Sequence, residues 1–235
     1  MGSGIFITGT DTGVGKTFFA CGLAHLLRES GYRVGVMKPA ETGCSTINGE
    51  LFPDDAARLK EASGCELPLE RICPYRLPDP VAPSVAAERQ GIRIDIDSLV
   101  DQYAEISSSN DITLVEGAGG LMVPLLPSYT YADFAALLKL PVIVVAANRL
   151  GVINHLLLTL EHASCKGLRP LGYVLNHTIS EASLAASTNR ETLSTLTAVP
   201  CIGELPFCNG ATQETPLSSG FADELDLSIL NLVLA

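Results

Sequence analysis

The chain has 235 residues, of which 47% are hydrophobic and 17% are charged. This length and composition suit one larger globular domain and exclude an intrinsically disordered chain. The formal net charge of −11 repels nucleic-acid backbones and anionic membrane surfaces. We therefore expect no nucleic-acid partner and no membrane partner.

The cysteines argue for a reducing compartment. There are seven, an odd number, and no Cys-x-x-Cys pair occurs. This usage argues against a disulfide framework and against a zinc knuckle, so we expect a cytoplasmic protein. The first residues, MGSGIFITG, lack the basic flank of a signal peptide. No segment approaches the roughly 18 consecutive apolar residues expected of a membrane-spanning helix.

Apolar segments and longer amphipathic segments alternate along the chain. Each apolar segment is rich in Val, Ile and Leu without strict alternation, which is typical of strands buried on both faces. The segments predict strands at 4–9, 32–39, 111–117, 140–148, 169–176 and 199–206. The amphipathic segments predict helices at 16–29, 96–106, 131–138, 152–166 and 181–195, and a further helix start near Asp54.

This order of elements predicts an α/β fold. Repeated strand–helix–strand units favour right-handed crossovers, and thus a doubly wound, mostly parallel sheet flanked by helices. We expect a single domain over residues 1–235. The proline-rich segment 73–83 is expected to be an ordered loop, and the polar segment 209–220 a mobile one.

The stretch GTDTGVGKT, residues 9–17, predicts a phosphate site between the first strand and the first helix. The N–H groups of such a loop and of the helix N-terminus converge on one point and favour an anion there. Lys16 adds a charge that can reach the terminal phosphates, and the Thr17 hydroxyl is placed to ligate Mg²⁺. Gly13 and Gly15 permit backbone angles that side chains would forbid.

The loop departs from the common pattern. Five residues separate Gly9 from Gly15, where the common phosphate loop has four. An ordinary glycine-containing turn is the alternative, but the strand before it, the helix after it and the intact Gly-Lys-Thr favour phosphate binding.

Carboxylates near this loop are candidate magnesium ligands, because Mg²⁺ prefers oxygen ligands and keeps several waters. Glu116 ends the strand 111–117, and doubly wound sheets build their sites at that edge. Asp54 and Asp55 lie near a helix start, where one of them could serve only as a cap. The residues themselves leave the choice between these two open.

Lys38 follows the second strand and precedes a proline turn. If that strand neighbours the first one, Lys38 lies beside the phosphate loop. Most lysines are solvated, but this position favours a functional role.

Seven motifs occur in order between residues 5 and 207: GTDTGVGKT, KPAETG, PDDAARL, VEGAGG, LGVINH, NHT and GELPF. This ordered set resembles the dethiobiotin synthetase family of biotin biosynthesis, whose phosphate loop has the longer spacing. The resemblance implies a P-loop NTPase fold and an ATP-dependent ligase. Its substrates would be 7,8-diaminononanoate, CO₂ and ATP, and its products dethiobiotin, ADP and phosphate. The implied intermediates are a carbamate and a mixed carbamic-phosphoric anhydride.

The same resemblance assigns roles to individual residues. It implies that Lys38 is catalytic, with Lys16 and Thr12 near the carbamate or the γ-phosphate, and that Thr42 contacts the substrate. It implies magnesium ligation by Thr17, Asp55 and Glu116, and so favours Asp55 over Asp54. The implied nucleotide site comprises Gly13, Val14, Gly15, Lys16, Thr17, Phe18, Asp55, Glu116, Gly117, Ala118, Gly119, Asn176, His177, Leu205, Pro206 and Phe207.

The resemblance also implies a homodimer whose active site spans two subunits. Gly151, Val152 and Asn154 would offer N–H groups from a helix start of the partner subunit to the substrate carboxylate. A tyrosine that holds this carboxylate in some relatives has no clear match, and Asn189 and Arg190 are the candidates to replace it.

Two other functional classes compete with this interpretation. A nucleotide switch of the partition-ATPase type carries a lysine five residues before the loop's Gly-Lys lysine, and Asp11 occupies that position here. A small-molecule kinase usually shows arginines in a lid, whereas the arginines here are scattered. A non-enzymatic binding module would not need Lys38 and Glu116 at strand ends.

Overall fold

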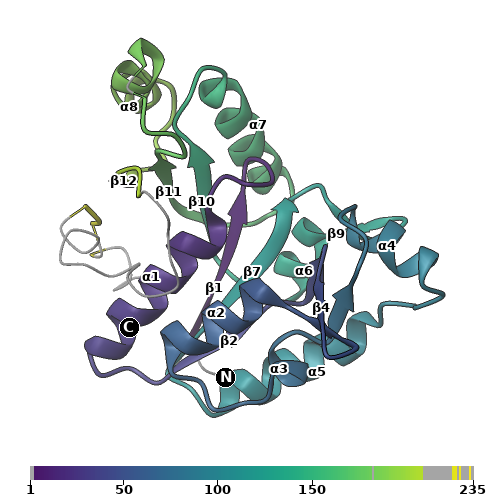
Figure 1. Ribbon diagram of the computed structural model, residues 1–235. Coiled ribbons are helices and arrows are strands. Elements are labelled where there is room, and N and C mark those ends of the chain that lie inside the picture. Colours follow the sequence, from purple (N-terminus) through teal and green to yellow (C-terminus); the bar gives the residue numbers. More distant parts are fainter. Residues whose placement is uncertain (1–2, 182, 209–223, 227, 229–232, 234–235) are drawn as a thin grey trace.

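A computed structural model of the chain describes residues 3–181, 183–208, 224–226, 228 and 233 (Figure 1). The segment 209–220, expected to be mobile, lies outside the described residues. Among those that are described, no helix has the length and hydropathy needed to cross a bilayer.

Six parallel strands form the central sheet. Their burial on both faces explains why the sequence segments are continuously apolar rather than alternating. The predicted doubly wound, parallel α/β fold is confirmed. Across the sheet the order is β12 (Cys201–Leu205), β11 (Pro170–Asn176), β10 (Val142–Ala147), β1 (Ser3–Gly9), β7 (Ile112–Gly120) and β2 (Val34–Met37).

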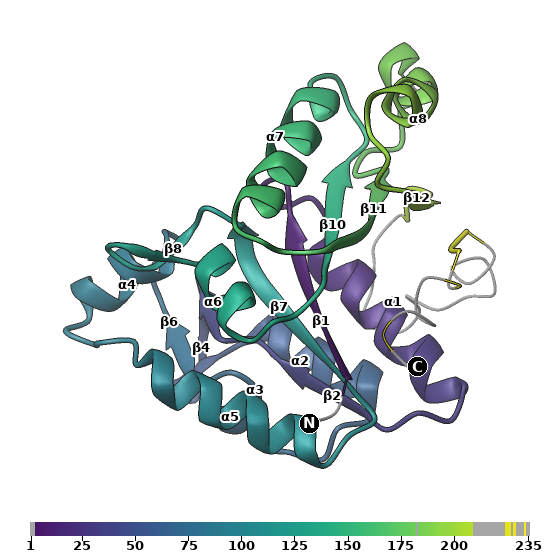
Figure 2. The same ribbon diagram turned by 180° about the vertical axis from the view of Figure 1, so that it is seen from behind.

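Helices cover both faces of the sheet (Figures 1 and 2). Two separate cores result, because successive residues of β1 point to opposite faces: Ile5 and Ile7 belong to one core and Phe6 to the other. On the first face lie α1 (Lys16–Glu29) and α2 (Asp54–Ser63). On the second lie α5 (Ile96–Ser108), α6 (Tyr131–Leu137) and α7 (Val152–Cys165), while α8 (Leu184–Leu196) packs on α7.

Several short elements were not predicted, and segment 73–83 is more than a loop because it contains β6 and the start of α4. The pairs are β3 (Ala40–Thr42) with β6 (Tyr75–Leu77), β4 (Ser45–Ile47) with β5 (Glu50–Phe52), and β8 (Pro124–Leu126) with β9 (Tyr129–Thr130). The short helices are α3 (Leu69–Ile72) and α4 (Pro83–Arg89).

Some predicted boundaries were wrong for identifiable reasons. Strand β2 ends at Met37 because the next N–H, that of Lys38, donates to Ile72 of α3 at 2.9 Å. Strand β7 continues beyond Glu116 to Gly120, which pairs with Gly9 after a shift in register. Helix α8 starts later than predicted, after the Ser183 side chain, which caps it.

Candidate active site

The phosphate loop joins the carboxyl end of β1 to the start of α1. Gly15 has φ +93°, and a Cβ atom there would lie 2.1 Å from the Asn176 amide nitrogen. That nitrogen donates to the carbonyl oxygen of Val14 at 2.9 Å. The Asn176 side chain, at the end of β11, can therefore reach the loop only because residue 15 is glycine and has no Cβ atom.

Lys16 is buried in this loop, with 7% of its surface exposed. Its Nζ donates to the carbonyl oxygen of Asp11 at 3.0 Å. Burial, and next the positive charge of Lys38, lower the pKa of Lys16 to about 8. A phosphate bound in this loop would contact the Lys16 ammonium group, which the hydrogen bond to Asp11 holds in position.

Lys38 lies at the centre of a buried ionic cluster. Its Nζ is 2.5 Å from Oε1 of Glu116 and 2.9 Å from Oδ2 of Asp55. Burial disfavours the ammonium form, but the charges of Glu116 and Asp55 outweigh it and raise the pKa of Lys38. Thr17 joins the cluster by donating its hydroxyl to Oε1 of Glu116 at 2.8 Å.

The cluster offers a hard, oxygen-rich ligand set. Oε2 of Glu116 is buried and has no hydrogen-bond partner among the described residues. Burial opposes the ionisation of Asp55, but Lys38 and Thr17 outweigh it and lower the pKa of that carboxyl. Two carboxylates and one hydroxyl fit Mg²⁺, which keeps waters and phosphate oxygens as its other ligands. No cluster of three or more His, Cys, Asp or Glu side chains in the described part of the chain could hold a metal by itself.

Glu41 is a buried carboxylate that the sequence analysis did not single out. It accepts hydrogen bonds from the backbone N–H groups of Asp55 at 2.9 Å and Ala56 at 3.0 Å. These contacts tie β3, which follows Lys38, to the N-terminus of α2. Burial raises the pKa of Glu41 to about 7. The one feature of the sequence that could have pointed to Glu41 is its place within the motif KPAETG, three residues after Lys38.

A cavity of about 580 Å³ opens onto the cluster. It contains the predicted catalytic residues Lys38, Lys16 and Thr12 and the predicted substrate contact Thr42. Unpredicted walls come from Arg58 of α2, from residues 80–83 and from Val123. The predicted nucleotide-site residues along its surface are Gly13, Gly15, Thr17, Phe18, Asp55, Ala118 and Gly119. Glu116 and Val14 lie deeper, at 1% and 2% exposure.

A second cavity, of about 220 Å³, shares Gly13 and Phe18 with the first one. It gathers residues predicted to contact the base, namely Asn176, His177, Pro206 and Phe207. Leu205 is fully buried, and its carbonyl oxygen accepts from the N–H of His177 at 2.9 Å. Because the two cavities share residues, they connect the region around the lysines to a slot at the ends of β11 and β12.

We call the cavity of about 580 Å³ that Lys16 and Lys38 line the lysine cavity. The first residues of α7 are not among the described residues that line it in their own subunit. Gly151 has φ +95°, and the side chain of Asn154 is exposed. The N–H of Val152 already donates to the carbonyl oxygen of Arg149 at 3.1 Å. Asn189 is 3% exposed and donates its amide to Asn148 and Arg149, so it does not reach outward.

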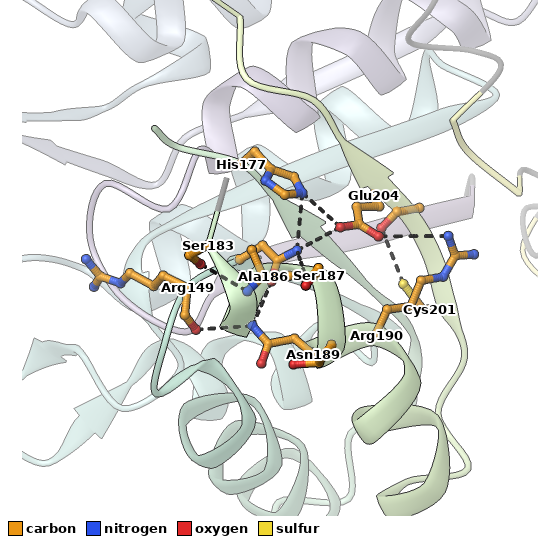
Figure 3. A network of polar contacts seen from close by, with 12 residues as sticks. Arg149, His177, Ser183, Ala186, Ser187, Asn189, Arg190, Cys201 and Glu204 are labelled. Atoms are coloured by element: carbon orange, nitrogen blue, oxygen red, sulfur yellow. Dashed lines mark hydrogen bonds and ion pairs between the residues drawn. The ribbon is translucent and has the colours of Figure 1, made fainter. Parts of the chain in front are cut away.

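Arg190 has an exposed side chain, with Nη1 4.0 Å from Oε2 of Glu204. Figure 3 shows this arginine beside Glu204, on the helix that also carries Asn189. Of the two candidates to replace the missing tyrosine, Arg190 is thus the one with an exposed cationic group.

Comparisons with known proteins agree with this geometry. The sequence matches the AAA domain family over residues 3–215. It is 44% identical to the ATP-dependent dethiobiotin synthetase BioD of Anaeromyxobacter dehalogenans (strain 2CP-C), over 85% of this chain and 92% of the relative. It is 38% identical to the protein of that name from Bacillus licheniformis, over 97% and 95% of the two chains.

Among solved structures, the septum site-determining protein MinD of Pyrococcus horikoshii, complexed with Mg-ADP, superposes with a TM-score of 0.57. The match covers 88% of this chain and 82% of that one, at 17% sequence identity. At this identity the likeness shows a shared P-loop NTPase fold and nothing about activity.

Proposed function

The chain belongs to the ATP-dependent dethiobiotin synthetase family, and we propose that it converts 7,8-diaminononanoate, CO₂ and ATP to dethiobiotin, ADP and phosphate. The observation that carries this proposal is that Lys16, Lys38 and Asp55 line one cavity beside the phosphate loop, with Glu116 buried behind it and paired with Lys38. The motifs that build this meeting are those shared with the family.

The reaction has three steps. One amine of the substrate adds to CO₂ and loses a proton to form a carbamate. A carbamate oxygen attacks the γ-phosphorus of ATP, ADP leaves, and a mixed carbamic-phosphoric anhydride forms. The second amine attacks the carbamoyl carbon, phosphate leaves, and the cyclic urea closes.

The chain's cations suit these steps. A carbamate anion that approaches a polyanionic phosphate needs positive charge around both groups, above all as charge moves to the leaving oxygen. Lys16 and Lys38 both line the cavity and supply this charge, and Thr12 lines the same cavity. Thr42 and the apolar residues Val81, Pro83 and Val123 form walls suited to a diamine with a methylene chain.

We assign magnesium to the Thr17 hydroxyl and to the Asp55 and Glu116 carboxylates. Oε2 of Glu116, which accepts no hydrogen bond from the part of the chain that the structure describes, supports this assignment. Mg²⁺, when bound, neutralises phosphate oxygens and takes up carboxylate charge that otherwise pairs with Lys38.

We assign the far end of the substrate to a partner subunit. Gly151, Val152 and Asn154 stand outside the lysine cavity of their own subunit, which supports a homodimer whose α7 start faces the neighbouring site. All seven cysteines are free, which supports a cytoplasmic location.

The direct test combines the protein with ATP, Mg²⁺, bicarbonate and 7,8-diaminononanoate, and measures phosphate and dethiobiotin together. We expect phosphate release to require the diamine and to match dethiobiotin one to one. Phosphate release that does not depend on the diamine would favour a nucleotide switch. Transfer of the γ-phosphate to a stable acceptor would favour a kinase.

A further inference from the structure

His177 follows β11 and forms part of two cavities. One is the slot of about 220 Å³ that also contains Gly13 and Phe18. The other, of about 300 Å³, lies toward α8 and contains Ser183 and Glu204. The imidazole thus separates the proposed base site from a polar network that ties β12 to α8 (Figure 3).

This network fixes how the amide of Asn148 is oriented. Its Oδ1 accepts from Nδ2 of Asn189 at 2.8 Å, so its own nitrogen points the other way. That nitrogen has two hydrogens, and its two shortest acceptors are Oε1 of Glu204 at 2.7 Å and the carbonyl oxygen of Ala186 at 3.1 Å. Both hydrogens are used, so none remains for His177, whose Nε2 is 3.2 Å away.

The same reasoning places the proton on the histidine ring. Nε2 of His177 lies 2.8 Å from Oε1 of Glu204. An ionised carboxylate can only accept, so Nε2 is the donor. In the neutral ring, Nδ1 is then an acceptor. Nδ1 makes no hydrogen bond to any described residue, and Figure 3 shows the second ring nitrogen on the side away from Glu204.

We propose that His177 is a specificity-determining residue that selects nucleobases carrying an amino group, and that Glu204 and Asn148 are the residues that set its tautomer. The 6-amino group of adenine would donate to Nδ1. The 6-oxo group of hypoxanthine or guanine would meet it acceptor against acceptor. The inference rests on the proposed function, with the base of ATP assigned to the smaller cavity because that cavity shares Gly13 and Phe18 with the lysine cavity.

The tautomer is tested without any nucleotide. The protein is labelled with ¹⁵N-histidine, and long-range ¹H–¹⁵N correlations are recorded at about pH 8, where an ordinary imidazole is neutral. The His177→Gln variant identifies the His177 signals by their loss. We expect the ring proton on Nε2. A proton on Nδ1 would overturn the proposal.

The selection is tested by binding, with calorimetric Kd values for Mg-ADP and Mg-IDP, which differ at position 6 of the purine. Wild-type protein should bind ADP about tenfold more tightly, as expected for one hydrogen bond gained against one acceptor clash. His177→Leu removes Nδ1 and puts no hydrogen-bond acceptor in its place, so the ratio of the IDP Kd to the ADP Kd should fall about fivefold or more. The matched variant His25→Leu, on α1, should keep the wild-type ratio.

An unchanged ratio in His177→Leu would assign the selection to another group, such as the Asn176 amide, and would overturn the proposal. Equal binding of the two nucleotides by the wild type would do the same. The proposed function fails on a different result, the absence of diamine-dependent dethiobiotin with wild-type protein and ATP.

Discussion

The Lys38 ammonium is the group on which the proposed chemistry depends most. It is 2% exposed and contacts two of the three proposed magnesium ligands. A buried cation between two carboxylates is costly to leave unpaired, so each of the three groups stabilises the position of the others. The cluster is therefore poised to exchange one set of charge partners for another when substrates arrive.

Lys38→Ala should reduce turnover by about 10²–10³-fold or more, because it removes a preorganised charge at the reacting centre. Turnover is measured as diamine-dependent phosphate release, with circular dichroism as the check on folding. Lys60→Ala, on α2 outside the cavity, is the matched control and should stay near wild type. Near-normal turnover in Lys38→Ala would remove the role assigned to this lysine.

Lys16 gives the site a pH dependence. Its pKa of about 8 lies below the ordinary value of 10.5, first because of burial and then because of Lys38. Below pH 8 the side chain carries the charge that attracts phosphate, and above pH 8 this charge is lost. The affinity for ADP should thus fall as pH rises above about 8, by up to roughly tenfold per pH unit.

The measurement is the Kd of Mg-ADP between about pH 7 and pH 9.5. Lys16→Arg stays protonated throughout this range, so its affinity should be weaker but flat. A flat wild-type profile would contradict this account. It would mean that Lys16 keeps its proton up to about pH 9.5, because the neighbouring carboxylates raise its pKa by more than burial lowers it.

At the scale of elements, short connections between strands and helices position the site. Glu41 joins β3 to the start of α2, and Asn176 joins β11 to the phosphate loop. Both are single buried side chains that satisfy backbone groups of another element. Such contacts fix the distance between elements that the sheet by itself leaves free.

Helix α6 offers a stability test of the same kind. The hydroxyl of Thr130 accepts from the N–H of Asp133, and the Asp133 carboxylate accepts from the N–H of Thr130 at 2.8 Å. Thr130→Ala should lower the free energy of unfolding by about 1 kcal/mol, because it leaves an N–H of the first turn without its cap. Thr130→Ser keeps the hydroxyl and should lose much less. Equal stabilities for the two variants in urea unfolding would contradict this account.

The main elements could be predicted from the sequence because they are long and buried in a regular pattern. The six strands and most of the helices follow from apolar periodicity, and the convergence of Lys16 and Glu116 follows from the rule that parallel strands build sites at their carboxyl ends. The predicted place of Lys38 requires β2 to lie beside β1, but β7 lies between those two strands. The two- and three-residue strands are too short to show a period. Glu41 and the network around Asn148 depend on which elements pack together, and one sequence does not state this.

At the scale of the whole molecule, the order of strands in the sheet separates the phosphate loop from the start of α7, the two parts of the proposed site. The phosphate loop lies at β1, in the middle of the sheet, while α7 starts after the neighbouring strand β10 and stands outside the lysine cavity. A second subunit whose α7 start faces this cavity would supply the missing contacts to the substrate carboxylate.

Mixed dimers test that arrangement. Lys38→Ala should disable the phosphate side, and Asn154→Asp should disable the carboxylate side by adding a like charge. In co-expressed mixtures, half of the dimers are mixed and carry one intact site, so about a quarter of wild-type activity should return. A mixture of Lys38→Ala with Lys16→Ala, both on the phosphate side, should recover nothing. Equal activity in the two mixtures would place the whole site within one subunit.

The central claim is that two lysines gather around the terminal phosphoryl group of ATP. A crystal structure with Mg²⁺, a non-hydrolysable ATP analogue and 7,8-diaminononanoate tests it most directly. We predict that Nζ of Lys16 and Nζ of Lys38 lie within about 3.2 Å of oxygens of the γ-phosphate or of the carbamate. If Lys38 stays paired with Glu116 and Asp55 while the γ-phosphate binds elsewhere, the account is wrong.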